Sequence, residues 1–252
     1  MAEIMPHIKL SEEQAAPYAL LPGDPGRLDR IADLLTDVEE LAYNREYRSL
    51  RGYYQGVPVL AVSTGIGGAS TTIAVEELVR IGVKSMIRIG SCGALQPDIR
   101  LGDLILVNGA VRDDGASDTY IDSIFPAIPD TELLIACMES AKELKAEYHV
   151  GIARSHDSFY IDDEEEVSAY WAEKGVLGSD METAALFIVG GLRGVKTASI
   201  LNTVVESEEN LEDNINQYTS GESQMMEGER KEILTALHAF VRINNEQYNK
   251  NL

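Results

Sequence analysis

The sequence predicts an α/β fold with a mainly parallel central sheet. Short apolar runs rich in β-branched residues alternate with stretches whose apolar residues recur at helical spacing. Several of these runs end in glycine-containing turns that lead straight into a helical stretch, as in strand–helix–strand units. No linker, repeat or change in composition divides the 252 residues, so we expect one domain over residues 1–252.

The first half of the chain supplies most of the expected strands. Residues 1–16 are largely polar and predict an arm outside the core. The glycine-rich stretch 64–70 opens a helix, but it lacks the Lys-Ser/Thr pair of a Walker motif and the spacing of a dinucleotide fingerprint. We expect strands at 18–21, 38–44, 47–54, 57–63 and 85–89. We expect one helix at 28–35 and a second that follows the stretch 64–70 and ends near residue 81.

The second half continues the alternation. Asp130 follows a proline and starts a helix with an apolar face that includes Leu133 and Cys137. Residues 206–213 hold five acids and predict a mobile loop. We expect strands at 103–111, 148–154 and 195–205. We expect further helices at 165–174 and 223–245, and one that follows residues 176–182 and ends near residue 192.

The charge balance limits the partners of the protein. The formal net charge is −21, from 42 acidic and 21 basic residues, which argues against nucleic-acid backbone and anionic membranes as partners. No apolar run approaches a membrane span, and the N-terminus has no signal pattern. Cys92 and Cys137 form neither a disulfide framework nor a metal spacing, so we expect a cytoplasmic protein.

Two arginines lie where an acidic protein would need them to bind a small anion. Arg88 lies inside the expected strand 85–89, just before the Gly/Ser turn 90–93, and a buried guanidinium requires a partner. That partner is either a bidentate anion or a structural carboxylate, and this stretch alone favours neither. Arg27 follows the turn 22–26 in a phosphate-site layout, although an Asp24 N-cap with Pro25 in the first turn explains the same residues.

Several motifs resemble the purine nucleoside/uridine phosphorylase family of bacterial nucleoside phosphorylases. The similarity extends from His7 to about Leu201. The motifs that carry it are Pro22-Gly-Asp-Pro25, Ser63-Thr-Gly-Ile-Gly-Gly68, Ile87-Arg-Ile-Gly-Ser-Cys-Gly93, Asp114-Gly-Ala-Ser117 and Asp180-Met-Glu182. The resemblance implies a three-layer α/β/α domain with a mainly parallel mixed sheet. It also implies reversible phosphorolysis of a nucleoside to free base and (deoxy)ribose 1-phosphate, with inorganic phosphate as co-substrate and no organic cofactor.

The resemblance also implies roles for particular residues. Arg88, Glu182 and Arg27 would be the catalytic residues. Phosphate would be bound by Gly23, Arg27, Arg45, Arg88 and Ser91, with Arg45 reaching into a neighbouring subunit. Ribose would be bound by His7, Met181, Glu182 and Asp180, with His7 donated across an interface. Taken alone, Glu182 would equally suit a helix N-terminus, and His7 a protein surface.

The family resemblance further implies an interface and a cation site. Arg45 and His7 complete a neighbour's site only in an oligomer, so we expect at least a dimer and, as usual in the family, a homohexamer built as three dimers. Glu46, Ile66 and Ser70 match a monovalent-cation site, for instance for K⁺. Their carboxylate, carbonyl and hydroxyl oxygens suit a hard cation, although an ordinary Glu–Ser hydrogen bond would also explain the pair.

The base-binding region departs from the family pattern. Phe159 and Gly93 match the family, but Asp163 and Glu165 replace the glutamine and arginine that read uracil in uridine phosphorylases, and an ionised carboxylate cannot donate to a carbonyl. Asn202 offers both a donor and an acceptor, and His156 replaces a small residue. We therefore expect a uridine phosphorylase-like enzyme, with a purine nucleoside phosphorylase as the alternative. A nucleosidase or a non-catalytic nucleoside-binding protein would fit the three arginines less well.

Overall fold

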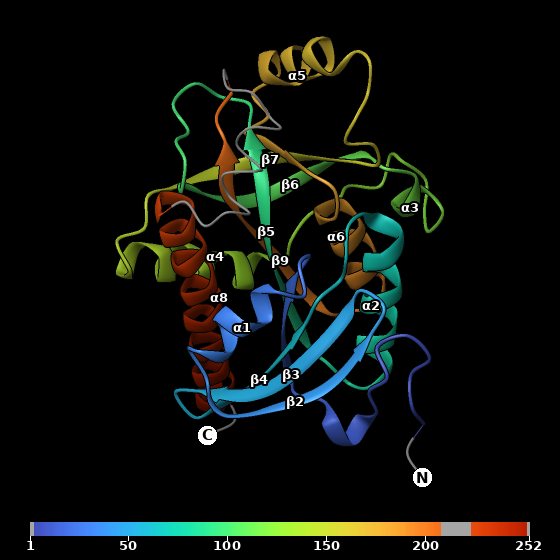
Figure 1. The fold of residues 1–252 in the computed structure, drawn as a ribbon, viewed down its shortest axis with the longest axis vertical. Helices are drawn as coiled ribbons and strands as arrows, with labels where there is room; N and C mark the ends of the chain where they lie inside the picture. The colour runs from blue at the N-terminus through green and yellow to red at the C-terminus, as the bar shows by residue number, and fades with distance from the viewer. Residues whose placement is uncertain (1–2, 208–222, 251–252) are drawn as a thin grey trace.

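The computed structural model of the protein describes residues 3–207 and 223–250, and within them a nine-stranded mixed sheet runs through the molecule (Figure 1). The strand order is β2-β3-β4-β1-β5-β8-β7-β6-β9, and β9 also pairs with β5. The strands are β1 (Tyr18–Pro22), β2 (Thr36–Asn44), β3 (Tyr47–Tyr54), β4 (Val57–Val62), β5 (Ser85–Ala94), β6 (Leu104–Asp113), β7 (Tyr148–His156), β8 (Gly178–Asp180) and β9 (Lys196–Val205).

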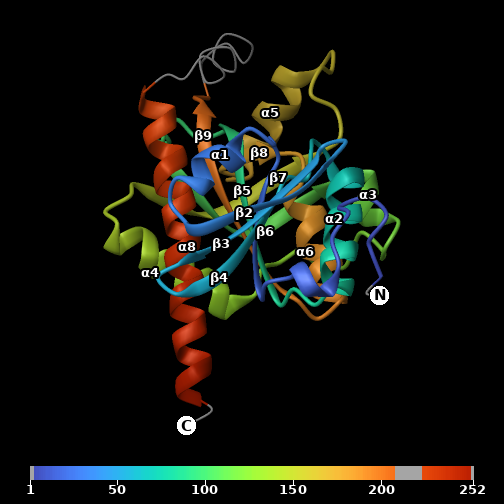
Figure 2. The ribbon, with the colours of Figure 1, turned by 60° about the horizontal axis from the view of Figure 1, so that its bottom comes forward.

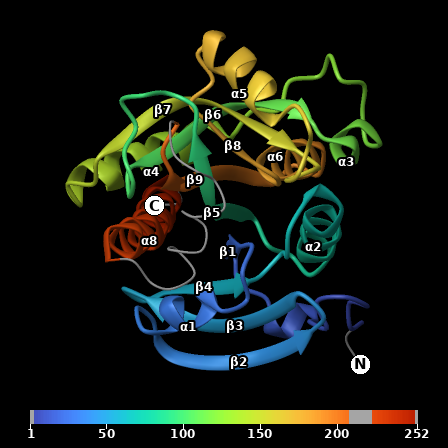
Figure 3. The same ribbon diagram turned by 45° about the horizontal axis from the view of Figure 1, so that its top comes forward.

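The pairing pattern confirms a mixed sheet with a parallel majority. Parallel pairs are β1–β4, β1–β5, β5–β9, β6–β7 and β7–β8, and antiparallel pairs are β2–β3, β3–β4, β5–β8 and β6–β9. Because β9 returns to β5, the strands β5, β8, β7, β6 and β9 close on one another like a small barrel, while β1 to β4 extend away from it (Figure 3). Strand β5 therefore belongs to both parts.

Helices cover the sheet on two sides (Figures 1 and 3). Helices α2 and α6 pack together on one side, and α4 and α8 pack together on the other. Figure 2 shows α8 as a long rod running along the molecule to the C-terminus. The helical elements are η1 (Glu12–Gln14), α1 (Arg27–Ala32), α2 (Gly68–Arg80), α3 (Gly115–Asp118), α4 (Thr131–Glu143), α5 (Glu164–Glu173), α6 (Thr183–Leu192) and α8 (Ser223–Lys250).

The N-terminal segment belongs to the core, so the expected arm at residues 1–16 was wrong. Ile8 and Leu10 have no exposed surface and join the apolar cluster beneath α2 and α6. A long-range contact holds them there. The buried carboxylate of Glu77 on α2 accepts hydrogen bonds from the backbone N–H groups of His7 and Ile8 at 3.0 and 2.8 Å.

Strand β5 is longer than expected, and the predicted sharp turn at residues 90–93 was wrong. The strand continues to Ala94 because its second half pairs with β9 on one side and with β8 on the other. The glycines permit close packing here. A side chain at 178 would overlap the carbonyl oxygen of Gly93, where the two strands meet. The short strand β8 itself was not expected.

Other differences from the expected elements are small. The N-cap of α1 is Gly26 and not Asp24, although Asp24 accepts a hydrogen bond from Gly26 N–H at 2.8 Å. Residues 115–118 form the short helix α3, which was not among the expected helices. Of the acidic stretch 206–213, only residues 206 and 207 are among the described residues. Within the described ranges, none of the helices is long and apolar enough to cross a membrane.

Candidate active site

A cavity of about 810 Å³ lies beside the middle of β5. Its wall comes from the turn after β1, the turn between β4 and α2, the second half of β5, and the ends of β7, β8 and β9. Ligand sites of α/β sheets commonly lie where strand ends and loops converge in this way. The cavity is lined by Gly23, Asp24, Pro25, Arg27, Glu46, Gly65, Ile66, Arg88, Gly90, Ser91, Cys92, Gly93, His156, Phe159, Tyr160, Ser179, Asp180, Met181, Glu182, Val204 and Val205.

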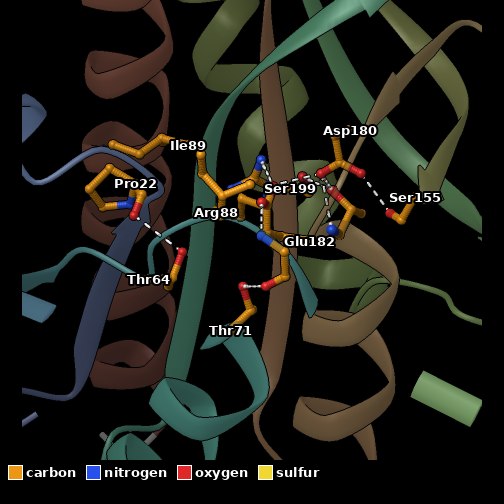
Figure 4. A network of polar contacts seen from close by, with 12 residues as sticks. Pro22, Thr64, Thr71, Arg88, Ile89, Ser155, Asp180, Glu182 and Ser199 are labelled. Atoms are coloured by element: carbon orange, nitrogen blue, oxygen red, sulfur yellow. Dashed lines mark hydrogen bonds and ion pairs between the residues drawn. The ribbon is translucent and has the colours of Figure 1, made fainter. Parts of the chain in front are cut away.

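Arg88 is buried in this wall and is held by two carboxylates (Figure 4). Its Nε donates to Asp180 Oδ2 at 2.9 Å, and its Nη2 pairs with Glu182. Although burial opposes the charge, Glu182 and Asp180 together raise the pKa of Arg88. Within this chain Arg88 therefore pairs with structural carboxylates, and its role in binding an anion stays a prediction. Its Nη1 has no hydrogen-bond partner among the described residues, which leaves one corner of the guanidinium for a ligand.

Arg27, the first residue of α1, is the second buried arginine of the cavity. Its Nη1 donates to the carbonyl oxygen of Ile89 on β5 at 2.7 Å, which ties α1 to the strand that carries Arg88. Glu229 and Glu232 of α8 approach the same guanidinium, at 3.0 Å from Nε and 3.4 Å from Nη1. Two buried arginines, each already paired with acids, therefore lie in one wall.

Asp180 is fully occupied by partners inside the protein (Figure 4). Its Oδ1 accepts from Ser155 Oγ at 2.6 Å. Its Oδ2 accepts from Arg88 Nε, and from the backbone N–H and the hydroxyl of Thr183 at 3.0 and 2.6 Å. A carboxylate has about four acceptor positions, so little capacity is left for a sugar hydroxyl. This geometry makes Asp180 a support for Arg88 and contrasts with the expected ribose contact.

Glu182 lies just before α6 but does not cap that helix with its side chain. It instead accepts from the backbone N–H of Gly67 at 2.6 Å and pairs with Arg88. Burial raises the pKa of Glu182, and the attraction of Arg88 opposes that rise. The carboxylate therefore links the glycine-rich turn before α2 to the arginine, in the middle of the cavity wall.

A smaller cavity of about 620 Å³ adjoins the first and shows how the site is ordered. The two cavities share Gly93, His156, Phe159, Ser179 and Val205, whereas Arg27 and Arg88 line only the larger one. One end of the site thus carries the two arginines with their paired acids, and the other carries the Phe159 ring together with the acids Glu164, Glu165 and Glu206. Cys92 lines the wall too, and burial raises its thiol pKa, so it remains neutral there.

Most of the predicted site residues come together in the larger cavity. These are Gly23, Arg27, Glu46, Ile66, Arg88, Ser91, Gly93, Phe159, Asp180, Met181 and Glu182. Ser70 lies next to this group, because its hydroxyl donates to the carbonyl oxygen of Ile66 at 3.1 Å. Glu46 and Ser70 both flank Gly65, where an added Cβ would meet them. The three residues matched to a cation site are therefore neighbours.

Besides Ser70, five other predicted residues do not line the larger cavity. Arg45 is exposed in the β2–β3 turn, and the His7 ring bonds Glu77 through Nδ1 at 2.6 Å. The Asn202 side chain is buried and donates to Met225 O at 3.0 Å. Asp163 precedes α5 and is exposed, whereas Glu165 on α5 lines the smaller cavity.

The sequence-based site lacked three residues that the structure brings to it. His156 lines both cavities. Its place two residues after the expected strand 148–154 was a usable signal. Glu229 and Glu232 are three residues apart on α8, so they share a helix face with the buried Ile233. Two acids on an apolar face indicate buried charge that needs a cationic partner, and this signal was available in the sequence.

The sequence and the fold match one family of proteins. The chain belongs to the phosphorylase superfamily, whose family model matches residues 17–234. Guanosine phosphorylase of Halorubrum lacusprofundi is 40% identical over 195 residues, which are 77% of this chain and 80% of that protein.

Two solved structures resemble the protein along nearly its whole length. A uridine phosphorylase from Vibrio fischeri superposes with a TM-score of 0.89 at 46% identity, covering 96% of this chain and 98% of that one. A purine nucleoside phosphorylase from Toxoplasma gondii, in complex with immucillin-H, gives a TM-score of 0.88 at 31% identity, covering 98% of both chains. The resemblance therefore extends to enzymes named for pyrimidine and for purine nucleosides.

Proposed function

We propose that the protein is a pentosyltransferase that catalyses reversible phosphorolysis of a nucleoside, in the manner of a uridine phosphorylase. One observation carries the proposal: a single cavity is lined by two buried arginines, by the aromatic ring of Phe159 and by the buried carboxylate of Glu182. Arginines bind inorganic phosphate, an aromatic ring packs on a nucleobase, and a carboxylate stabilises a cationic sugar. The relatives named for uridine phosphorylase support this reading.

The end of the site that carries Arg27 and Arg88 suits the attacking phosphate. Arg27 and Arg88 approach one anion from α1 and β5, and Ser91 and the backbone at Gly23 add hydrogen-bond donors. Fixing the phosphate beside C1′ removes much of the entropic barrier to the displacement. As the bond to the base breaks, positive charge builds up on the sugar, and the Glu182 carboxylate stabilises it while accepting hydrogen bonds from ribose hydroxyls. Met181 packs beside the sugar and Phe159 on the base.

An oligomer completes this proposed site. Arg45 is exposed and His7 is turned toward Glu77, so neither serves the cavity of its own chain. We propose that both act in the site of a neighbouring subunit, in at least a dimer and, by family likeness, in a hexamer of three dimers. Glu46, Ile66 and Ser70 are proposed to hold a monovalent cation such as K⁺ beside that interface. A cytoplasmic location remains a prediction from the cysteine usage.

Purine nucleosides are the second candidate substrates. The residues that stand where uridine phosphorylases read uracil, Asp163 and Glu165, lie outside the larger cavity. Relatives named purine nucleoside phosphorylase are 40% identical over 210 residues. The same phosphate and ribose machinery serves either base, so the base-binding end decides between them.

The test is phosphate-dependent release of base by Arg88 variants. Wild type should release base from uridine or inosine only with phosphate, and Arg88→Ala should abolish this activity. Arg88→Lys keeps the charge opposite Asp180 and Glu182 but loses the fork, and should lose most activity while staying folded. Arg51→Ala, which removes a surface partner of Glu39, is the matched control. Release without phosphate, or near-normal turnover by Arg88→Ala, would refute the assignment.

A further inference from the structure

The imidazole of His156 occupies the end of the site opposite the arginines. The residue ends β7, is only 8% exposed and lines both cavities together with Phe159 and Ser179. Asp180, on the neighbouring strand β8, pairs in parallel register with Ser155. His156 therefore lies next to the turn that carries Met181 and Glu182, which are proposed to bind ribose. His156 also lies in the wall beside the space where a base would lie.

The backbone fixes the tautomer of this ring. Nδ1 lies 2.9 Å from the carbonyl oxygen of Ser158. A carbonyl oxygen can only accept, so Nδ1 carries the hydrogen, and in the neutral ring Nε2 is left with a lone pair. Within the described ranges, no hydrogen bond reaches Nε2. A residue that lines both cavities thus carries a hydrogen-bond acceptor, Nε2, on a ring held in place at Nδ1.

A second polar group stands close by in the same wall. Ser179 on β8 pairs with Arg154 on β7, and Arg154 precedes His156 by two residues. Ser179 lines both cavities. The Ser179 hydroxyl is buried and has no hydrogen-bond partner among the described residues. A hydroxyl can donate to a carbonyl oxygen, so this wall combines an acceptor with an available donor.

We propose that His156 reads the base by accepting a hydrogen bond from a ring N–H, with Ser179 donating to the adjacent carbonyl. The inference rests on the proposed phosphorolysis. Uracil at N3 and the 6-oxopurines at N1 present such an N–H beside a carbonyl. Cytosine at N3 and adenine at N1 present a bare lone pair, which would face the lone pair of Nε2. The protein therefore selects oxo bases over amino bases, whether it accepts pyrimidines, purines or both.

Two substitutions separate the two ring nitrogens of His156. In His156→Asn the amide replaces Nδ1 and keeps the bond to Ser158, but the group at Nε2 is lost. In His156→Gln an amide reaches the Nε2 position. We expect His156→Asn to lower the kcat/KM ratio of inosine to adenosine, or of uridine to cytidine, by roughly ten- to hundredfold at pH 8, where an ordinary imidazole is neutral. His156→Gln should restore part of that ratio.

His149→Asn is the matched control, because His149 lies on the same strand and bonds Asp103 outside both cavities. Its ratio should equal that of wild type. An unchanged ratio in His156→Asn, or a wild type that prefers adenosine and cytidine, would overturn the proposal.

Calorimetric binding of hypoxanthine against adenine, and of uracil against cytosine, tests the same selection without turnover. Tighter binding of the oxo bases supports the role of His156 even if phosphorolysis itself fails, and equal binding overturns that role. A failure of the proposed function would instead appear as no phosphate-dependent release from any nucleoside.

Discussion

Replacing Glu232 by glutamine should change how the stability of the protein depends on pH. Glu232 has no exposed surface, and one of its oxygens, Oε1, is buried without a hydrogen-bond partner among the described residues. Burial raises the pKa of this carboxyl from 4.5 to about 8, against the attraction of Arg27. The folded protein therefore holds a proton on Glu232 at neutral pH, and glutamine imitates that protonated form.

The sign and size of the effect follow from the two pKa values. Between pH 4.5 and about 8 the folded state binds a proton that the unfolded state releases. The stability due to this group is thus fully present below pH 4.5 and is lost as the pH rises through about 8. Each pH unit in this window lowers the stability of wild type relative to Glu232→Gln by about 1.4 kcal/mol, or roughly 3 kcal/mol between pH 5 and pH 7.

Urea unfolding at one protein concentration, repeated at half-unit steps from pH 5 to pH 8, measures this difference directly. The free energies of unfolding of wild type and Glu232→Gln should diverge in favour of the variant as the pH rises. Glu227→Gln, an exposed acid on the same helix, should run parallel to wild type. Parallel profiles for wild type and Glu232→Gln would show that the Glu232 carboxyl is ionised in the folded protein, and the reasoning would fail.

Two further substitutions test the site and the core. In Gly90→Ala the new methyl overlaps the Arg88 guanidinium, so the KM for phosphate should rise about tenfold with little change in melting temperature. Gly191→Ala, where the methyl meets nothing within 4 Å, should match wild type, and equal KM values would contradict the expected displacement. Ile8→Ala should lower the free energy of unfolding by about 2–5 kcal/mol, whereas Ile4→Ala, at a 64% exposed position, should cost under about 0.5 kcal/mol. Equal unfolding free energies for these two variants would place the N-terminal segment outside the core.

The parts of the site that lie within single motifs were predictable from the sequence. Arg88 was singled out from its own strand, whereas Gly93, Met181 and Glu182 were nominated because the short motifs that carry them resemble a known family. The alternation of strands and helices was predictable because it depends on periodicity within short windows.

Features that depend on contacts between distant segments were not predictable in this way. The N-terminal segment has little apolar periodicity, and its burial depends on Glu77, some 70 residues away. The continuation of β5 beyond Gly90 depends on pairing with β8 and β9. Glu229 meets Arg27 only because α8 returns across the sheet from the far end of the chain. The position of Arg45 relative to a second subunit is likewise a property of an assembly.

The pairing of each buried arginine with acids has a consequence for how an anion enters. With Glu232 neutral, Arg27 and Arg88 face the three carboxylates of Asp180, Glu182 and Glu229, so the empty pocket has no surplus positive charge. An incoming phosphate must compete with these attached carboxylates for the guanidinium groups, as a solute ion competes with the resident ion of an exchange resin. The affinity for phosphate is then set by competition with carboxylates that belong to the protein itself. This competition favours fast release of the anion.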